Sequence, residues 1–228
     1  MLRTAATVFA RWRFLVLTLL TCAWLLLMPL LYGDWRVQLL LEAFMLVALL
    51  VTVWANPDWR KLRTVLLVLW LASVAGTLLS IAMTDHPAWR WSRTLELASL
   101  VPLMAMLAVG MLAFVLRQRT LTLDCIFATI AAYLLVGVLF AQVYLCLLTW
   151  NPASFWLPIG VADRPIHLLQ SDMTYFSLVT LATVGYGDIL PVTTTARMLA
   201  MIEAVVGQFY VAVVVAIFVG KYSSQRRN

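Results

Sequence analysis

Charged residues are scarce in this chain of 228 residues. They make up 11% of the sequence, whereas 64% of it is hydrophobic. A soluble domain is about one quarter charged and about half apolar, so this chain has too few polar side chains to cover a surface that faces water. The scarcity of charge therefore excludes an ordinary soluble protein and predicts a surface in contact with lipid.

Residues that ligate metals or act as nucleophiles are also few. The chain has two histidines and three cysteines, and Cys22, Cys125 and Cys146 all lie in apolar runs without metal-ligand spacing. We interpret these cysteines as small buried hydrophobic residues. The few ionisable residues of the apolar segments do not gather into a candidate catalytic site. The sequence thus predicts neither an enzyme nor a protein with a bound cofactor.

Long apolar segments dominate what is present. Each of six segments is near or above the roughly 20 residues that cross a bilayer as a helix. They cover roughly 14–32, 36–55, 64–83, 95–116, 123–149 and 196–220. The first segment has an alternative interpretation as a signal peptide, because arginines precede it, but its length favours a retained helix. We therefore predict an all-α membrane protein with six transmembrane helices.

The positive charges indicate the orientation of these helices. If both termini are cytoplasmic, eleven Lys and Arg residues lie inside and five outside, which is the bias that sets topology. The inside group is Arg3, Arg11, Arg13, Arg60, Lys61, Arg63, Arg117, Arg119, Lys221, Arg226 and Arg227, and the outside group is Arg36, Arg90, Arg93, Arg164 and Arg197. The net charge of +6 is better explained by anionic lipid headgroups than by nucleic acid. We expect a multi-pass protein of the cell membrane whose partners include lipids and not nucleic acid.

The interval 150–195, between the fifth and sixth segments, differs from the other loops. Its residues Met173–Ala182 are apolar but too few to span a bilayer, which is typical of a re-entrant segment. The sequence TVGYGD, Thr183–Asp188, follows directly. A Gly-x-Gly in a loop is often only a turn. This one follows a short apolar helix between two spanning segments on the predicted outer side, and that context favours a functional motif.

The motif resembles the selectivity filter of the potassium channel family, in which TVGYG loops from four subunits surround the ion. The resemblance is strongest over residues 123–220 and includes Pro191 and Arg197 after the motif. It implies a pore domain over 120–228, with an outer helix, a pore helix, a filter and an inner helix. Residues 1–119 would form a four-helix N-terminal domain that resembles a degenerate voltage sensor.

The chemistry of the motif explains its composition. A potassium ion sheds its water in a narrow pore, and backbone carbonyl oxygens take the place of that water. Carbonyls of an ordinary strand alternate in direction, and Gly185 and Gly187 relieve this because glycine adopts positive φ. The expected ligands are the backbone oxygens of Thr183, Val184, Gly185 and Tyr186, with the hydroxyl of Thr183 innermost. One chain supplies a quarter of such a cage, which implies a homotetramer.

The pore helix is expected at 172–182, with Asp172 at its N-cap or in its first turn. By resemblance, Asp188 is tied to an aromatic and an acidic residue of this helix. Tyr175 occupies the aromatic position, whereas Val179 occupies the acidic one, so one partner is missing. The aromatic residues Tyr175, Phe176 and Tyr186 either support the filter as a cuff or simply pack.

The inner helix carries further candidates. Gly207 falls where family members have a hinge glycine, although close helix packing also explains it. Gln208, Val211, Val215 and Val219 share one helical face, which by resemblance lines the cavity and inner mouth; ordinary helix packing is the alternative. Such a valine-rich pore could close by dewetting.

Charges within the membrane complete the sequence evidence. Glu42 and Glu203 are either functional acids or neutral, hydrogen-bonded structural carboxyls. The fourth segment, 95–116, contains no Arg or Lys. A voltage sensor needs several such charges, each worth about 2.3 kcal/mol per 100 mV. Steep voltage gating is therefore not supported.

These observations predict a potassium-selective channel subunit that conducts K⁺ passively. A less selective cation channel is one alternative, although the intact Tyr186-Gly187 argues against it. A translocating subunit of a potassium transporter is another, but the two halves of the chain show no repeat of the kind common in transporters. A non-conducting modulatory subunit is the third, and the intact filter motif makes it less favoured.

Overall fold

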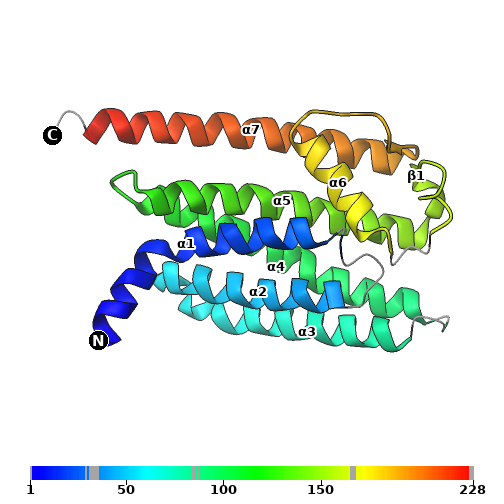
Figure 1. Ribbon diagram of the computed structural model, residues 1–228, viewed down its shortest axis with the longest axis horizontal. Helices are drawn as coiled ribbons and strands as arrows, with labels where there is room; N and C mark the ends of the chain where they lie inside the picture. The colour runs from blue at the N-terminus through cyan, green and yellow to red at the C-terminus, as the bar shows by residue number, and fades with distance from the viewer. Residues whose placement is uncertain are drawn as a thin grey trace.

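The computed structural model describes residues 2–28, 30, 36–83, 86, 88–164 and 168–225. Over these residues the chain is almost entirely helical (Figure 1). The long helices are α1 (Leu2–Leu27), α2 (Arg36–Ala55), α3 (Arg63–Ala82), α4 (Trp89–Arg117), α5 (Leu123–Trp150) and α7 (Thr194–Gln225). The short helix α6 (Gln170–Leu181) lies between α5 and α7 in the sequence, and 3₁₀ turns occupy Pro57–Lys61 and Pro152–Ser154. The predicted all-α class is confirmed.

Five of the helices, α2 to α5 and α7, are long and apolar enough to cross a membrane. The apolar part of α1 that is described, Trp12–Leu27, is shorter. The predicted first span, 14–32, includes residues 29, 31 and 32, which lie outside the described residues. The chain is therefore a multi-pass membrane protein, and the count of six spans stays a prediction.

The helices lie roughly side by side, with α7 along one edge and α2 and α3 along the other (Figure 1). Helix α4 packs on α3 and α5, and α1 packs on α5, so the first four helices rest on α5 of their own chain. The start of α1 and the end of α7 lie at the end of the molecule opposite to α6 (Figure 1). The predicted cytoplasmic arginines Arg226 and Arg227 lie outside the described residues.

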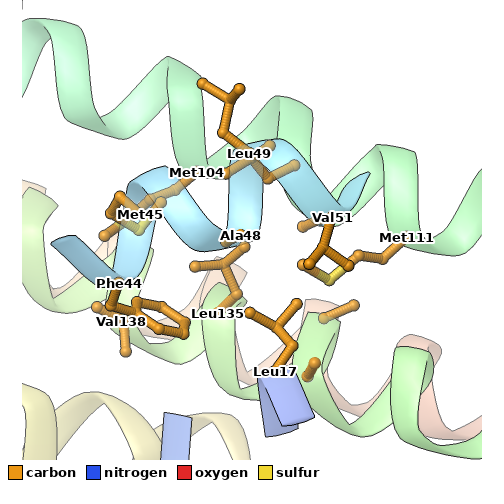
Figure 2. Close-up of a cluster of buried hydrophobic side chains, with 14 of the residues drawn as sticks. Leu17, Phe44, Met45, Ala48, Leu49, Val51, Met104, Met111, Leu135 and Val138 are labelled. Atoms are coloured by element: carbon orange, nitrogen blue, oxygen red, sulfur yellow. The ribbon is translucent and has the colours of Figure 1, made fainter. Parts of the chain in front are cut away.

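Two clusters of buried side chains hold the helices together. The first joins α1, α2, the start of α3, α4 and the first half of α5, and Figure 2 shows Leu17, Phe44, Ala48, Met111 and Leu135 meeting there. The second joins the later part of α5 to α6, to the short strand β1 (Phe155–Trp156) and to the start of α7. Because α5 contributes to both clusters, it is the common support of the N-terminal helices and of the predicted pore domain.

The beginning of α5 and the end of α7 are fixed by polar contacts. The Thr122 hydroxyl accepts a hydrogen bond from the backbone N–H of Cys125 (3.3 Å) and caps α5. In the first turn, Asp124 accepts from the backbone N–H of Phe14 (3.1 Å), which ties α5 to α1. Near the end of α7, Lys221 donates to the carbonyls of Val115 (2.9 Å) and Gln118, where its positive charge complements the C-terminus of α4.

Helix α4 begins earlier in the sequence than the predicted fourth span. The predicted fourth span begins at residue 95, but α4 begins at Trp89 and so includes Arg90 and Arg93. Arg93, expected among the outer charges, is only 4% exposed and pairs with Glu96 one turn later. A run of apolar residues cannot reveal this, because pairing with an opposite charge is what permits an arginine to be buried.

Candidate functional site

Helix α6 is the element that positions the candidate site. Its 12 residues are too few to cross a bilayer, and they begin two residues before the predicted start of the pore helix. Asp172 lies in the first turn and pairs with Arg164, at 3.3 Å between Oδ2 and Nη1. The side chain of Met173 is fully buried against the second cluster, and the Ser177 hydroxyl donates to the carbonyl of Gly137 in α5 (2.5 Å). The helix is thus anchored along its length.

The segment after α6 has an unusual backbone. Thr183, Gly185 and Gly187 have φ values of 57°, 59° and 81°, all in the left-handed region. Positive φ at alternate residues turns successive carbonyl groups toward the same side, unlike an ordinary strand. Among the described residues, Thr183 is the one non-glycine with positive φ. A β-branched residue there costs about 1–3 kcal/mol, which the surroundings must offset.

Three hydrogen bonds hold the start of this segment. The backbone N–H of Thr183 donates to the carbonyl of Thr180 (2.9 Å), and that of Val184 donates to the carbonyl of Val179 (2.9 Å). From α7, the side-chain amide of Gln208 donates to the hydroxyl of Thr183 (2.9 Å). These contacts restrain Thr183 from both its backbone and its side chain.

The C-terminal end of the segment is held by a tyrosine of α6. The Tyr175 hydroxyl donates to Oδ2 of Asp188 (2.7 Å), and this bond raises the pKa of Tyr175 to about 12, so the hydroxyl stays a donor at neutral pH. The rings of Tyr175 and Tyr186 stack, with centroids 6.3 Å apart and planes 5° apart. The strand pair β1 (Phe155–Trp156) and β2 (Leu190–Pro191) then ties the following residues to the end of α5.

Phe176 takes a different place from the other two aromatic residues. Phe176 is only 7% exposed. On the side of α6 that faces α5, its ring makes edge contacts with the rings of Tyr144 and Phe155, with centroids 5.2 and 5.3 Å away. The structure therefore brings Tyr175 and Tyr186 together as the sequence suggested, but places Phe176 in the core behind α6. Any support that Phe176 gives to residues 183–187 acts through the position of α6.

Glu203 of α7 lies behind α6 and is fully buried. The Tyr144 hydroxyl donates to Oε2 of Glu203 (2.5 Å), and Oε1 contacts the hydroxyl of Ser177. Ser177 has one proton, and its other close neighbour, the carbonyl of Gly137, can only accept. Both contacts of Ser177 are satisfied together when Glu203 carries a proton of its own. The arrangement favours a neutral, hydrogen-bonded carboxyl over a functional ionised one.

Glu42 of α2 is also hydrogen-bonded. The hydroxyls of Ser73 and Thr77 in α3 donate to its Oε1, the latter over 3.0 Å. A few residues further along α3, Ser80 contacts Oε2 of Glu96 (3.2 Å). These polar contacts pass between helices of the N-terminal domain, and none of those named reaches residues 183–187. Glu42 therefore belongs to the packing of that domain.

Gly207 lies where α7 crosses the end of α6. A Cβ atom added there would lie 2.1 Å from the carbonyl oxygen of Leu181, so the crossing requires glycine. Helix α7 continues without interruption from residue 194 to 225. Close packing explains Gly207 in this conformation, and its role as a hinge stays a prediction.

The predicted cavity-lining residues lie on a part of α7 that its own chain does not cover. Val211, Val215 and Val219 are 50%, 54% and 60% exposed. Gln208, on the same face, is also exposed and is the one that reaches the segment after α6. This face is open to other molecules.

Comparison of the chain with known proteins identifies its family. A family model described as ion channel matches residues 130–224, from α5 to the end of α7. Protein LctB of Bacillus caldotenax is 35% identical over 95 residues, which cover 42% of this chain and 70% of the relative. The chain belongs to the ion channel family. Two pore potassium channel c of Oryza sativa subsp. japonica is 34% identical over 90 residues, which cover 40% of this chain and 17% of that protein.

The matches confirm the resemblance to the potassium channel family that the sequence motif indicated. The family model covers most of the predicted pore domain, and its match does not extend to the first four helices. No solved structure matches the chain significantly.

Several contacts of this channel chain could not be anticipated. Tyr144 and Ser177 lie in apolar helices with no motif around them, and only the fold brings them to Glu203. Thr183 at positive φ runs against the ordinary preference of β-branched residues. The bond between Gln208 and Thr183 joins residues 25 positions apart whose sequence context suggests no contact.

Proposed function

We propose that this channel is selective for potassium and that four copies of the chain form its pore. The observation that carries the proposal is the alternation of positive φ at Thr183, Gly185 and Gly187, directly after a short helix that cannot span the membrane. Carbonyl groups turned to one side form a row of ligands for a cation that has shed its water. In this proposal the permeant ion is K⁺, and it moves passively down its electrochemical gradient.

The ligands would be the backbone oxygens of Thr183, Val184, Gly185 and Tyr186, followed by Gly187 at the outer mouth, with the hydroxyl of Thr183 innermost. One copy offers these oxygens from one side only, so a closed cage requires further copies around an axis. The exposure of the chain supports this. Val184 and Tyr186 are 53% and 70% exposed in a single copy, and neighbouring copies would cover them.

The surrounding helices suit a cation path. The C-terminus of α6 directly precedes Thr183, and its partial negative charge favours a cation there. Along α7, the exposed side chains of Val211, Val215 and Val219 would line the inner pore, where a hydrophobic constriction can gate by dewetting. The match to an ion channel family model supports a channel subunit that is not an enzyme.

The N-terminal helices do not favour steep voltage sensing. Within the described part of α4, the buried arginine Arg93 is neutralised by Glu96, whereas a voltage sensor needs several charges that move through the field. We place the protein in the cell membrane with both termini in the cytoplasm, as the distribution of basic residues indicates. The end of the molecule that carries α6 would then face outward.

Ion flux from liposomes that contain the purified protein tests this function. We expect K⁺ to leave much faster than Na⁺, and Gly185→Ala to abolish conduction or selectivity, because alanine disfavours positive φ. Gly160 provides a matched control. It also has positive φ, at 83°, but lies in the outer loop with no atom near its Cβ position.

Gly160→Ala imposes a similar backbone strain away from the proposed filter and should leave the K⁺/Na⁺ flux ratio unchanged. Equal K⁺ and Na⁺ fluxes in the unmodified protein would contradict potassium selectivity. An unchanged flux ratio in Gly185→Ala would contradict the assignment of the filter.

A further inference from the structure

The contact between Gln208 and Thr183 joins the inner helix to the start of the proposed filter. Gln208 follows Gly207, whose backbone packs on Leu181, and its amide nitrogen lies 2.9 Å from the Thr183 hydroxyl. Thr183 is also the residue whose hydroxyl would be the innermost ligand of the pore. A side chain of α7 therefore touches a proposed ligand directly.

An outside partner can orient the hydroxyl of Thr183 as a ligand. It has one proton and two lone pairs, and a ligand of a cation must present a lone pair to it. Rotation about χ1 exchanges the hydroxyl with the methyl group among three staggered positions. Donation from Gln208 occupies one lone pair and selects the position in which the hydroxyl faces α7. The other lone pair remains available.

We propose that Gln208 is a positioning residue that fixes the Thr183 hydroxyl as the innermost potassium ligand. This inference rests on the proposed potassium-selective function and adds a specific role for α7 to it. Because the two residues lie on different elements, ion binding at Thr183 and the position of α7 are coupled. Coupling is reciprocal, so K⁺ at the innermost site favours the placement of α7 in which Gln208 reaches Thr183.

Other contacts make it possible to remove this bond without losing the fold. In the residues just before Gln208, α7 is held to α6 by the contact of Glu203 with Ser177 and by the packing of Gly207 on Leu181. Gln208 itself is exposed in the single chain, so no buried polar group is stranded when its amide is replaced. The channel should therefore assemble without the Gln208 amide.

The test replaces Gln208 with methionine, which keeps the unbranched length but has no N–H group. Gln142→Met is the matched control, because it makes the same chemical change in α5. The amide of Gln142 is buried and makes no hydrogen bond within the described residues. Two quantities are measured on purified tetramers. One is the K⁺/Na⁺ flux ratio in liposomes, and the other is the rise in Tm when K⁺ replaces Na⁺.

We expect Gln208→Met to lower the K⁺/Na⁺ flux ratio by roughly 2- to 10-fold, the range that corresponds to one hydrogen bond. The rise in Tm caused by K⁺ should shrink with it, because a weaker site stabilises the folded state less. Gln142→Met should alter neither the flux ratio nor the K⁺-dependent rise in Tm. A purely structural role of Gln208 would change Tm equally in both salts.

A double-mutant cycle removes the remaining ambiguity. In a Thr183→Val background the hydroxyl is absent, so Gln208→Met should have no further effect on the flux ratio. Additive effects, or an unchanged flux ratio and K⁺-dependent Tm in Gln208→Met alone, would overturn this inference while leaving potassium selectivity intact. If the unmodified protein conducts Na⁺ as well as K⁺, the proposed function fails first and this inference fails with it.

Discussion

The hydroxyl of Tyr144 in α5 lies 2.5 Å from Oε2 of Glu203 in α7, and both side chains are fully buried. Ser177 of α6 contacts the other carboxyl oxygen. One acidic side chain thereby joins α5, α6 and α7. The three helices that position residues 183–187 share this polar junction.

The junction predicts how Glu203 tolerates substitution. Because the contacts favour a protonated carboxyl, Glu203→Gln keeps one donor and one acceptor in place and should change the free energy of unfolding by less than about 1 kcal/mol. Glu203→Leu leaves the hydroxyls of Tyr144 and Ser177 without that partner and should cost about 1–3 kcal/mol. Thermal unfolding of the purified protein in detergent measures both. If glutamine proves as damaging as leucine, the ionised carboxylate is required instead.

A substitution at Gly207 distinguishes the two explanations of this residue, close packing and a hinge. Gly207→Ala places a methyl group against the Leu181 carbonyl, so packing predicts a lower Tm and loss of assembled channel. A pure hinge predicts a normal Tm with altered conduction. Gly220→Ala is the control on the same helix, because nothing lies near its Cβ position. It should stabilise α7 by roughly 0.5–1 kcal/mol, and a lower Tm there would show that alanine harms α7 irrespective of packing.

The sequence predicted those parts of the structure that depend on local pattern. Apolar length located the spanning helices, and the short run before Thr183 predicted α6 to within two residues of its start. The positive φ of Gly185 and Gly187 follows from the freedom of glycine. These features are encoded by neighbouring residues, and so they can be recognised without the fold.

The parts that could not be predicted depend on distant residues. The beginning of α4 differs from expectation because Glu96 neutralises Arg93, and a hydropathy pattern registers the charge but not its partner. Thr183 adopts positive φ at a place where α6 holds its backbone and Gln208 of α7 bonds to its hydroxyl, contacts that its neighbours in the sequence do not announce. Phe176 packs toward α5 and away from Tyr186 because helical rotation decides its direction, and the sequence of α6 has no marked apolar face that would reveal that rotation.

The bond between Tyr175 and Asp188 predicts a pH dependence. The pKa of Tyr175 is raised to about 12 by this bond, so the stabilisation is fully present below the ordinary tyrosine pKa near 10. It is lost as pH rises through about 12. The K⁺/Na⁺ flux ratio should therefore stay constant between about pH 8 and 10, where an unperturbed tyrosine begins to ionise. Tyr175→Phe should lower the ratio at every pH, and a ratio equal to that of the unmodified protein would show that the bond does not support the proposed filter.

The side chain of Arg93 connects the N-terminal helices to α6, the proposed pore helix. It pairs with Glu96, and its Nη2 donates to the side-chain oxygen of Gln170, the first residue of α6 (3.2 Å). All three residues are more than nine-tenths buried. The arrangement makes α4 a direct support for the start of α6, which gives the N-terminal helices a structural role that needs no voltage sensing.

Double-mutant analysis tests this support. Gln170→Leu removes the acceptor while leaving the pair of Arg93 with Glu96 intact, and Arg93→Gln removes the charge. Because the residues share a buried network, the two changes should be non-additive by about 0.5–3 kcal/mol in the free energy of unfolding. Arg90→Gln, at an exposed position one turn earlier in α4, should stay within about 0.5 kcal/mol of the unmodified protein. Strictly additive effects of Arg93→Gln and Gln170→Leu would mean that α4 and α6 are stabilised independently, and the N-terminal helices would then need another connection to the pore.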